Sequence, residues 1–230
     1  IRNPIEFYEK YLLELPDEEE VEETVAANTM GNIVHETLET LYRPFLNQIL
    51  SPKLLRTTLP QVDEIVLHNF EKFYKNGEID FGKNHIIVEV AKYFVQSFIK
   101  KEAAQLEQNE IILLELEKKI SREVTIPGMD YNIKLKGFAD RIDSCNGVKR
   151  IIDYKTGLVK PEDLKIKELE LITSDYKYSK ALQVMCYAYM IFGEEDFPPM
   201  DAGIISFRNM GAGFMRFNNE VITTEILGQF

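Results

Sequence analysis

The chain has 230 residues, a hydrophobic content of 45% and a formal net charge of −11. These values predict a globular protein with a substantial core, and the absence of any run of about 18 apolar residues argues against a membrane-spanning protein. Two cysteines are too few for a disulfide framework or a four-cysteine metal site, so we expect a cytoplasmic protein. The chain begins without methionine in a charged segment, which suggests a domain cut from a longer protein.

The negative charge is unevenly distributed along the chain. Residues 118–180 contain fourteen Lys/Arg and ten Asp/Glu, whereas the run PDEEEVEE at 16–23 is strongly acidic. Nucleic-acid-binding proteins usually present a basic surface, so the net charge argues against DNA binding unless the basic segment provides that surface. The acidic run is interpreted as a solvated loop.

The first half of the chain is predicted to be helical. Apolar residues recur at helical spacing in residues 4–15, 30–50, 60–74 and 85–106. Pro44 is expected to kink or end the second of these helices, and Pro60 suits the first position of the third.

The second half changes to strand-like patterns. Residues 112–126 drift toward strand character, and residues 131–143 alternate apolar and lysine side chains as a half-buried strand does. Asn146-Gly147 is a strong hairpin signal, with the return strand at 148–154. A helix at 177–193 and strands at 201–209 and 213–219 follow. We expect a layered α/β domain, with a helical part at 1–112 and a sheet-containing core at 113–230.

A two-residue loop at Asn146-Gly147 would bring two acidic residues face to face. Asp140 would then lie opposite Asp153, with Lys155 on the same face of the sheet. Opposed carboxylates repel each other, so a bound divalent cation is expected to offset the repulsion, and Mg²⁺ prefers such oxygen ligands. Turn chemistry alone explains the pair poorly, because neither aspartate lies in the turn.

The same register places Asp143 opposite Arg150 on the other face of the hairpin. We interpret this pair as an ordinary cross-strand ion pair with a structural role.

Four segments in order resemble a known nuclease family. GFADRID (137–143) followed by IIDYKTG (151–157) resembles the core motif of the PD-(D/E)XK nucleases, in the RecB-like branch that includes the nuclease domains of RecB, AddA and AddB. GNIVHETLE (31–39) resembles the helical segment upstream of that core, and QVMCY (183–187) resembles the segment downstream. The resemblance implies a restriction-endonuclease-like fold, in which helices flank a mixed central sheet, with an N-terminal helical elaboration.

The resemblance also implies site residues at the matching positions. Asp140 and Asp153 would be metal ligands together with the backbone carbonyl of Tyr154, and His35 would approach the metal from its helix. The implied cofactor is Mg²⁺, with Mn²⁺ as an alternative.

Further residues would complete the implied site. Lys155 would orient the attacking water and stabilise developing negative charge, and Gln183 and Tyr187 would orient DNA or this lysine. Three lysines of the segment after the core are expected to contact the nucleic acid: Lys160, Lys177 and Lys180.

The chain departs from the family pattern at two places. Ala139 replaces the proline of the family's name, and Asn3-Pro4 stands where some relatives carry the first cysteine of an iron–sulfur cluster. The C-terminal region lacks the matching three cysteines, so we expect no iron–sulfur cluster.

Three functions are compatible with these features. The first is a Mg²⁺-dependent DNA exonuclease domain of a recombination or repair helicase–nuclease, with a helicase domain or subunit as partner. The second is a catalytically silent DNA-binding or scaffolding module with the same fold. The third is another metal-dependent phosphodiesterase or an RNA nuclease, because nothing in the sequence identifies a 2′-hydroxyl reader.

Overall fold

The computed structural model describes Tyr8 and residues 27–74, 82–126, 128, 130–173, 175–192 and 199–230. Apart from Tyr8, the predicted helix at 4–15 lies outside the described residues, as do Asn3-Pro4 and the acidic run at 16–23. Within the described part of the chain, no helix combines the length and the apolar character needed to cross a bilayer.

The helices predicted within the described residues are present, and two short helices occur in addition. The helices are α2 (Ala27–Tyr42), α3 (Pro52–Arg56), α4 (Val62–Phe73), α5 (Gly82–Gln105), α6 (Ser179–Phe192) and α7 (Thr224–Gln229). Helix α2 ends two residues before Pro44, which confirms the predicted helix end. The short helices α3 and α7 were not predicted from the sequence.

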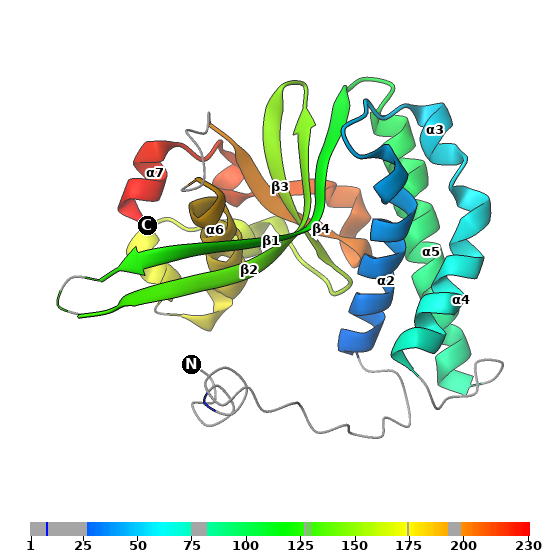
Figure 1. The fold of residues 1–230 in the computed structure, drawn as a ribbon, viewed down its shortest axis with the longest axis horizontal. Helices are drawn as coiled ribbons and strands as arrows, with labels where there is room; N and C mark the ends of the chain where they lie inside the picture. The colour runs from blue at the N-terminus through cyan, green and yellow to red at the C-terminus, as the bar shows by residue number, and fades with distance from the viewer. Residues whose placement is uncertain are drawn as a thin grey trace.

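Five strands form one mixed sheet in the order β1-β2-β3-β4-β5. The strands are β1 (Ile111–Thr125), β2 (Asn132–Cys145), β3 (Val148–Lys155), β4 (Asp201–Ser206) and β5 (Phe214–Arg216). Strands β3 and β4 pair in parallel, and the other neighbours are antiparallel. Helices lie on both faces of this sheet (Figure 1), so the predicted α/β restriction-endonuclease-like fold is confirmed.

The hairpin between β2 and β3 has the predicted register. Asn146 and Gly147 both adopt positive φ angles, 52° and 83°, as a two-residue turn of this type requires. Asp143 pairs with Arg150 in the ladder and accepts hydrogen bonds from its guanidinium at 2.7 and 2.9 Å. The predicted structural ion pair is therefore confirmed.

The sheet separates two hydrophobic cores. Ile152 and Tyr154 of β3 join the core formed with α2, α4 and α5, whereas Ile151 joins the core formed with α6 and α7. This division follows from the alternation of side chains along a strand. Strand β3 is the central strand of the sheet and contributes side chains to both cores.

Strands β1 and β2 change direction midway and then continue as a long two-stranded ribbon that projects from the sheet (Figure 1). The register between them shifts between Leu113 and Glu115, and Glu117 has a positive φ of 46°. A non-glycine residue in this conformation is strained, and such strain is typical of functional sites. The bend therefore combines a register shift with a strained residue in one short stretch of β1.

Replacement of Gly203 by alanine should destabilise the sheet. A Cβ atom at Gly203 would lie 2.1 Å from the backbone carbonyl oxygen of Met215 on the neighbouring strand β5. Overpacking of this kind lowers the free energy of unfolding by about 1–3 kcal/mol. Urea denaturation should show a lower midpoint for Gly203→Ala than for Gly211→Ala, whose added Cβ meets no atom within 4 Å. Equal midpoints would contradict the close β4–β5 packing.

Candidate functional site

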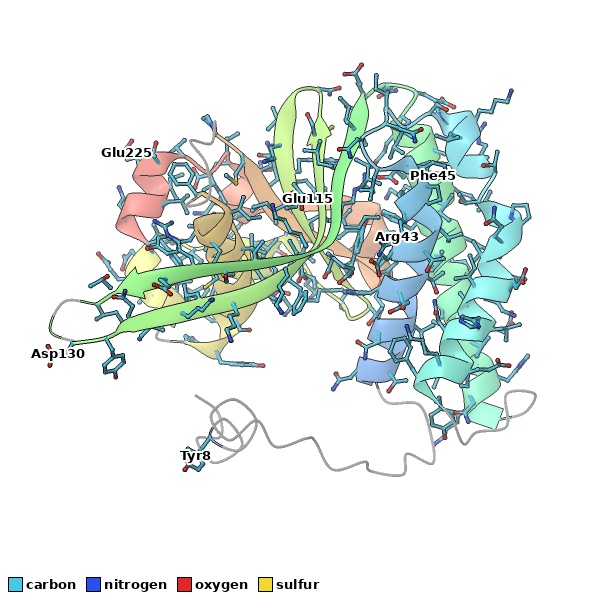
Figure 2. The ribbon with its side chains drawn as sticks, viewed as in Figure 1. Tyr8, Arg43, Phe45, Glu115, Asp130 and Glu225 are labelled. Carbon is cyan, nitrogen blue, oxygen red and sulfur yellow. The ribbon has the colours of Figure 1, made fainter. Side chains whose placement is uncertain are left out.

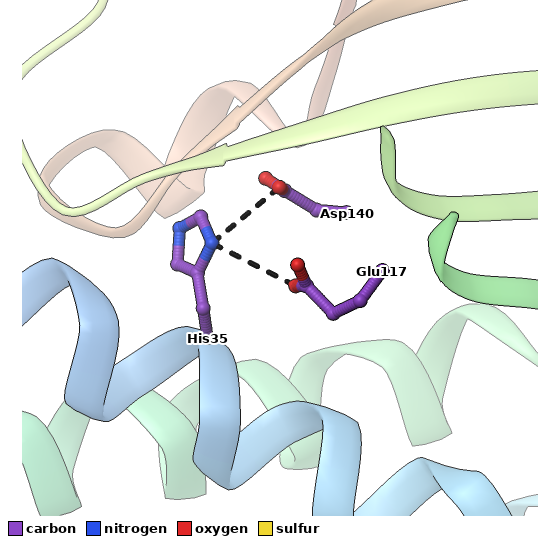
Figure 3. Close-up of side chains that lie close together, drawn as sticks. All are labelled: His35, Glu117 and Asp140. Atoms are coloured by element: carbon purple, nitrogen blue, oxygen red, sulfur yellow. Dashed lines mark ion pairs between the residues drawn. The ribbon is translucent and has the colours of Figure 1, made fainter. Parts of the chain in front are cut away.

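Helix α2 presents His35 to the middle of the sheet (Figure 3). Its Nε2 atom lies 3.0 Å from the backbone carbonyl oxygen of Tyr154, which can only accept a hydrogen bond. Nε2 therefore carries the proton and donates it. The other ring nitrogen, Nδ1, faces Asp140 Oδ1 at 3.5 Å and Glu117 Oε1 at 3.9 Å.

Asp140 is held beside His35 by the backbone of β3. Its Oδ2 atom accepts a hydrogen bond of 2.6 Å from the backbone N–H of Tyr154, and the side chain is buried. The β2–β3 ladder extends to Arg141 and Ile152, so the Asp140–Asp153 positions lie one step beyond its last pair. The carboxylate of Asp140 therefore contacts a neighbouring peptide group at the point where the ladder ends.

Glu117 completes this cluster, and the sequence did not indicate it. It lies on β1 between the paired positions Leu116–Arg141 and Lys118–Ala139, which places it across from Asp140. The sequence does show an acidic residue in the segment before GFADRID. Its position opposite Asp140, however, depends on how β1 pairs with β2, which the sequence does not specify. Burial raises the pKa of the Glu117 carboxyl to about 7, and the negative charge of Asp140 adds to this effect.

The donor atoms of His35, Glu117 and Asp140 fit a divalent cation. One ligand atom from each residue lies within 4.8 Å of the other two, and the set offers two carboxylate oxygens and one imidazole nitrogen. The N–H of His35 that is directed away from the cluster donates to a backbone carbonyl, which is the usual way in which proteins orient a metal-binding imidazole.

Asp153 and Lys155 lie next to each other on the same face of β3, as side chains two residues apart do. Lys155 Nζ donates to Asp153 Oδ1 at 2.9 Å and also lies 2.7 Å from Oδ2. The buried Oδ2 atom still lacks an aligned hydrogen-bond donor among the described residues. Burial raises the pKa of Asp153 to about 6, opposed by Lys155 and reinforced by the charge of Asp140.

The pKa of His35 reflects the same excess of negative charge. Burial alone lowers this pKa, but the hydrogen bond and charge of Asp140, with smaller contributions from Glu117 and Asp153, raise it above its ordinary value. The cluster therefore attracts positive charge, and a bound cation would supply it.

Helix α6 covers the other side of this region with Gln183 and Tyr187. Gln183 Nε2 donates to the Tyr187 hydroxyl at 2.7 Å, which confirms that they share a helix face. Burial raises the pKa of Tyr187, and the negative charge of Asp153 contributes, so this phenol lies near the acidic cluster. Gly137 admits the ring closely, because a Cβ there would lie 2.9 Å from Tyr187 Cε1.

Of the three lysines predicted to bind nucleic acid, Lys160 and Lys177 lie on the connection between β3 and α6, and Lys180 lies in the first turn of α6. Lys177 pairs with Asp175 at 3.0 Å, and Lys180 pairs with Asp163 at 3.4 Å. Lys160 is exposed and precedes a short turn. Their role in binding stays a prediction.

Comparison with known proteins identifies the family. A family model described as the PD-(D/E)XK nuclease superfamily matches residues 1–224. The chain belongs to this superfamily. Two similar proteins are uncharacterized proteins of Rickettsia conorii, 24% identical over 81% of this chain, and of Rickettsia felis, 27% identical over 84% of it. The aligned region spans only 22% and 21% of these two relatives, or about a fifth of their length.

The PD-(D/E)XK membership agrees with the observed mixed sheet and with the position of the cluster. The motif residues Asp140, Asp153 and Lys155 lie where β2 and β3 separate, and His35 approaches from α2. Glu117 adds to these motif residues a further carboxyl group, which lies across from Asp140.

Glu117 should make the metal-free PD-(D/E)XK domain less stable as the pH rises. Its pKa of about 7 in the folded state exceeds the value of about 4.3 expected for an unfolded glutamate. The folded state binds more protons between these values, so this contribution to stability is present at low pH and is lost as the pH rises through 7. Asp153, with a pKa of about 6, acts in the same direction.

This expectation can be checked by thermal denaturation in EDTA between about pH 5 and 8. Glu117→Gln should lose less stability over this range than the wild type. Glu123→Gln, an exposed residue of the same strand, should follow the wild type. A Glu117→Gln profile parallel to that of the wild type would show that burial does not perturb this carboxyl group.

Proposed function

We propose that the chain is a metal-dependent nuclease domain that hydrolyses DNA phosphodiester bonds. The observation that carries this proposal is the cluster of His35, Glu117 and Asp140 beside the Asp153–Lys155 pair, at the motif position of a PD-(D/E)XK protein. The pKa of each of the two acidic groups Glu117 and Asp153 is raised, and such shifts are typical of catalytic and metal sites.

The metal would be held by the carboxylates of Asp140 and Glu117 and by Nδ1 of His35. Asp153 and the carbonyl of Tyr154, which the motif also implies as ligands, lie on the adjacent residues of β3. A bound Mg²⁺ or Mn²⁺ would polarise the phosphoryl oxygen and lower the pKa of bound water. Oxygen-rich ligands favour Mg²⁺, and the imidazole makes Mn²⁺ a suitable alternative.

The residues of the chain have separate roles in this proposal. The Lys155 ammonium, held by Asp153, orients the attacking water and stabilises negative charge on the phosphate. His35 donates to the Tyr154 carbonyl through Nε2, which fixes the orientation of its ring. Gln183 and Tyr187, which are hydrogen-bonded to each other on α6, orient the DNA or Lys155 in this proposal.

We further propose an exonuclease of the RecB-like branch that works with a helicase in DNA repair or recombination. The His segment, the core motif and the Q-x-x-x-Y segment occur in the order of that branch. The aligned region is only about a fifth of the two Rickettsia relatives, which supports a larger parent protein. We propose that another domain of this parent provides part of the DNA contact.

Addition of Mg²⁺ or Mn²⁺ should raise the melting temperature. A ligand at one hundred times its Kd stabilises the native state by about 2.7 kcal/mol, or roughly 5–11 °C for a chain of this size. Asp140→Asn should lose most of this increase, whereas Glu64→Gln, an exposed residue of α4, should retain it. An equal increase in Asp140→Asn and wild type would place the cation elsewhere.

Lys155→Ala and Asp153→Ala should each reduce cleavage of DNA by at least about 100-fold, because each removes a group that acts on the transition state. The assay uses end-labelled linear and closed-circular DNA, single-stranded and double-stranded, with and without Mg²⁺. Lys53→Ala, on the distant helix α3, is the control.

Digestion restricted to linear DNA would support the exonuclease. Binding by wild type without digestion under any metal condition would replace this proposal by the silent scaffolding module, and cleavage restricted to RNA would replace it by the RNA nuclease.

A further inference from the structure

One face of the β1–β2 ribbon leads outward from the cluster of His35, Glu117 and Asp140. Cross-strand partners share a face, so the β1–β2 pairs define this face as far as the turn near Asp130 (Figure 2). We call this the ribbon face. Its residues are Lys119, Ser121, Glu123, Thr125, Asn132, Lys134, Lys136 and Phe138.

The opposite face of the ribbon is already covered by α6. Arg122 donates to the Tyr189 carbonyl at 2.7 Å and lies 3.9 Å above the Tyr189 ring, and Gly137 lies against Tyr187 and Met190. The ribbon is therefore attached to the domain through one side, and the ribbon face is the side directed away from α6.

The ribbon face is basic although the whole chain is acidic. It carries Lys119, Lys134 and Lys136 against the single acid Glu123, and all four side chains are exposed. None of these three ammonium groups forms an ion pair with another described residue. In a chain of net charge −11, such lysines are available to a phosphate backbone.

An exposed aromatic ring lies at the inner end of this face. Phe138 is 54% exposed within a strand, and it lines the same cavity of about 300 Å³ as His35 and Glu117. It pairs with Lys119 across the ribbon. A ring and lysines along one path form the combination that binds unpaired nucleic acid, in which bases stack on the ring and phosphates meet the lysines.

We infer that the ribbon face binds a single DNA strand and guides its end to the His35–Glu117–Asp140 cluster. From Asp140 to Asn132 the path covers eight residues, or about 26 Å at the rise of an extended strand. Phe138 stacks on a base next to the scissile phosphate, and the lysines hold the backbone that follows. The inference rests on the proposed nuclease function and assigns its substrate as an unpaired strand.

Binding in EDTA tests the ribbon face independently of catalysis. The probe is a fluorescein-labelled single-stranded oligothymidine, measured by anisotropy across a series of salt concentrations. Lys134→Glu/Lys136→Glu should weaken binding at least about tenfold and reduce the salt slope by about 1.4, because each single-strand phosphate contact contributes about 0.7.

The charge control is Lys53→Glu/Lys100→Glu, which places the same two reversals on exposed positions of α3 and α5. Both double variants change the net charge from −11 to −15, so a general electrostatic effect would weaken both equally. Equal weakening of the two would overturn the inference. Circular dichroism melting of each variant verifies that the fold is retained.

Two conservative substitutions of Phe138 test whether its ring stacks on a base. Phe138→Leu should weaken binding by roughly 5- to 150-fold, the range that corresponds to the loss of one stacked base, and Phe138→Tyr should bind like the wild type. Equal binding by Phe138→Leu and wild type would overturn the stacking role.

Binding of duplex DNA is measured in the same way, because a two-stranded ribbon also fits the major groove of a duplex. If the variants lose duplex binding as strongly as single-strand binding, the assignment of an unpaired strand is wrong.

Cleavage by the wild type with Mg²⁺ or Mn²⁺ separates the two proposals. If the wild type does not cleave, but the ribbon variants lose binding and the charge control does not, the nuclease proposal fails and the ribbon assignment stands. Ribbon variants that bind and cleave like the wild type would refute the ribbon face and leave the nuclease intact.

Discussion

The site depends on the two hydrogen bonds that the backbone of Tyr154 forms. Its N–H donates to Asp140 and its carbonyl accepts from His35, so one residue connects β2, β3 and α2. Strand β3 lies in the middle of the sheet between β2 and β4, where neither backbone group can turn without breaking a ladder. The positions of an acid and an imidazole are thereby fixed by the peptide geometry rather than by flexible side-chain contacts. This arrangement suits a site that must hold its groups before a substrate arrives.

The Tyr154 side chain joins a second polar cluster that contrasts with the first. Its hydroxyl lies 3.4 Å from Arg141 Nη1, and the fully buried Arg141 pairs with Asp143 at 2.7 Å and with Glu102 at 2.8 Å. With Arg150, this cluster contains two cations and two carboxylates, so its charges balance. Removal of one partner from such a buried pair destabilises a protein by about 3–5 kcal/mol. The proposed site, by contrast, combines three carboxylates (Glu117, Asp140 and Asp153) with two basic groups (His35 and Lys155). This excess of carboxylates would suit a bound cation.

The local part of this structure could be predicted from the sequence, and the non-local part could not. Asn146-Gly147 determines its own turn, so the register that pairs Asp143 with Arg150 followed from a few adjacent residues. Glu117 depends on the longer β1–β2 connection and on a register shift, and a slip of one residue would turn its side chain to the other face. The residue patterns did not specify that β3 and β4 pair in parallel, because a crossover that contains α6 separates the two strands; the mixed sheet was implied by the family resemblance.

The bend at Glu117 connects the chemistry of the site with the ribbon. Its positive φ occurs where the two strands leave the sheet, so the residue that adds a carboxylate to the cluster also stands where the ribbon changes direction. An acidic domain repels a nucleic acid at long range, and attraction must come from a local basic surface. The lysines of the ribbon lie beyond the bend, away from the carboxylates, so phosphates can meet positive charge before they approach the negative cluster. In the proposed mechanism, a cation at that cluster would then remove the remaining repulsion for the phosphate that reacts. Metal binding and substrate entry would therefore depend on each other electrostatically.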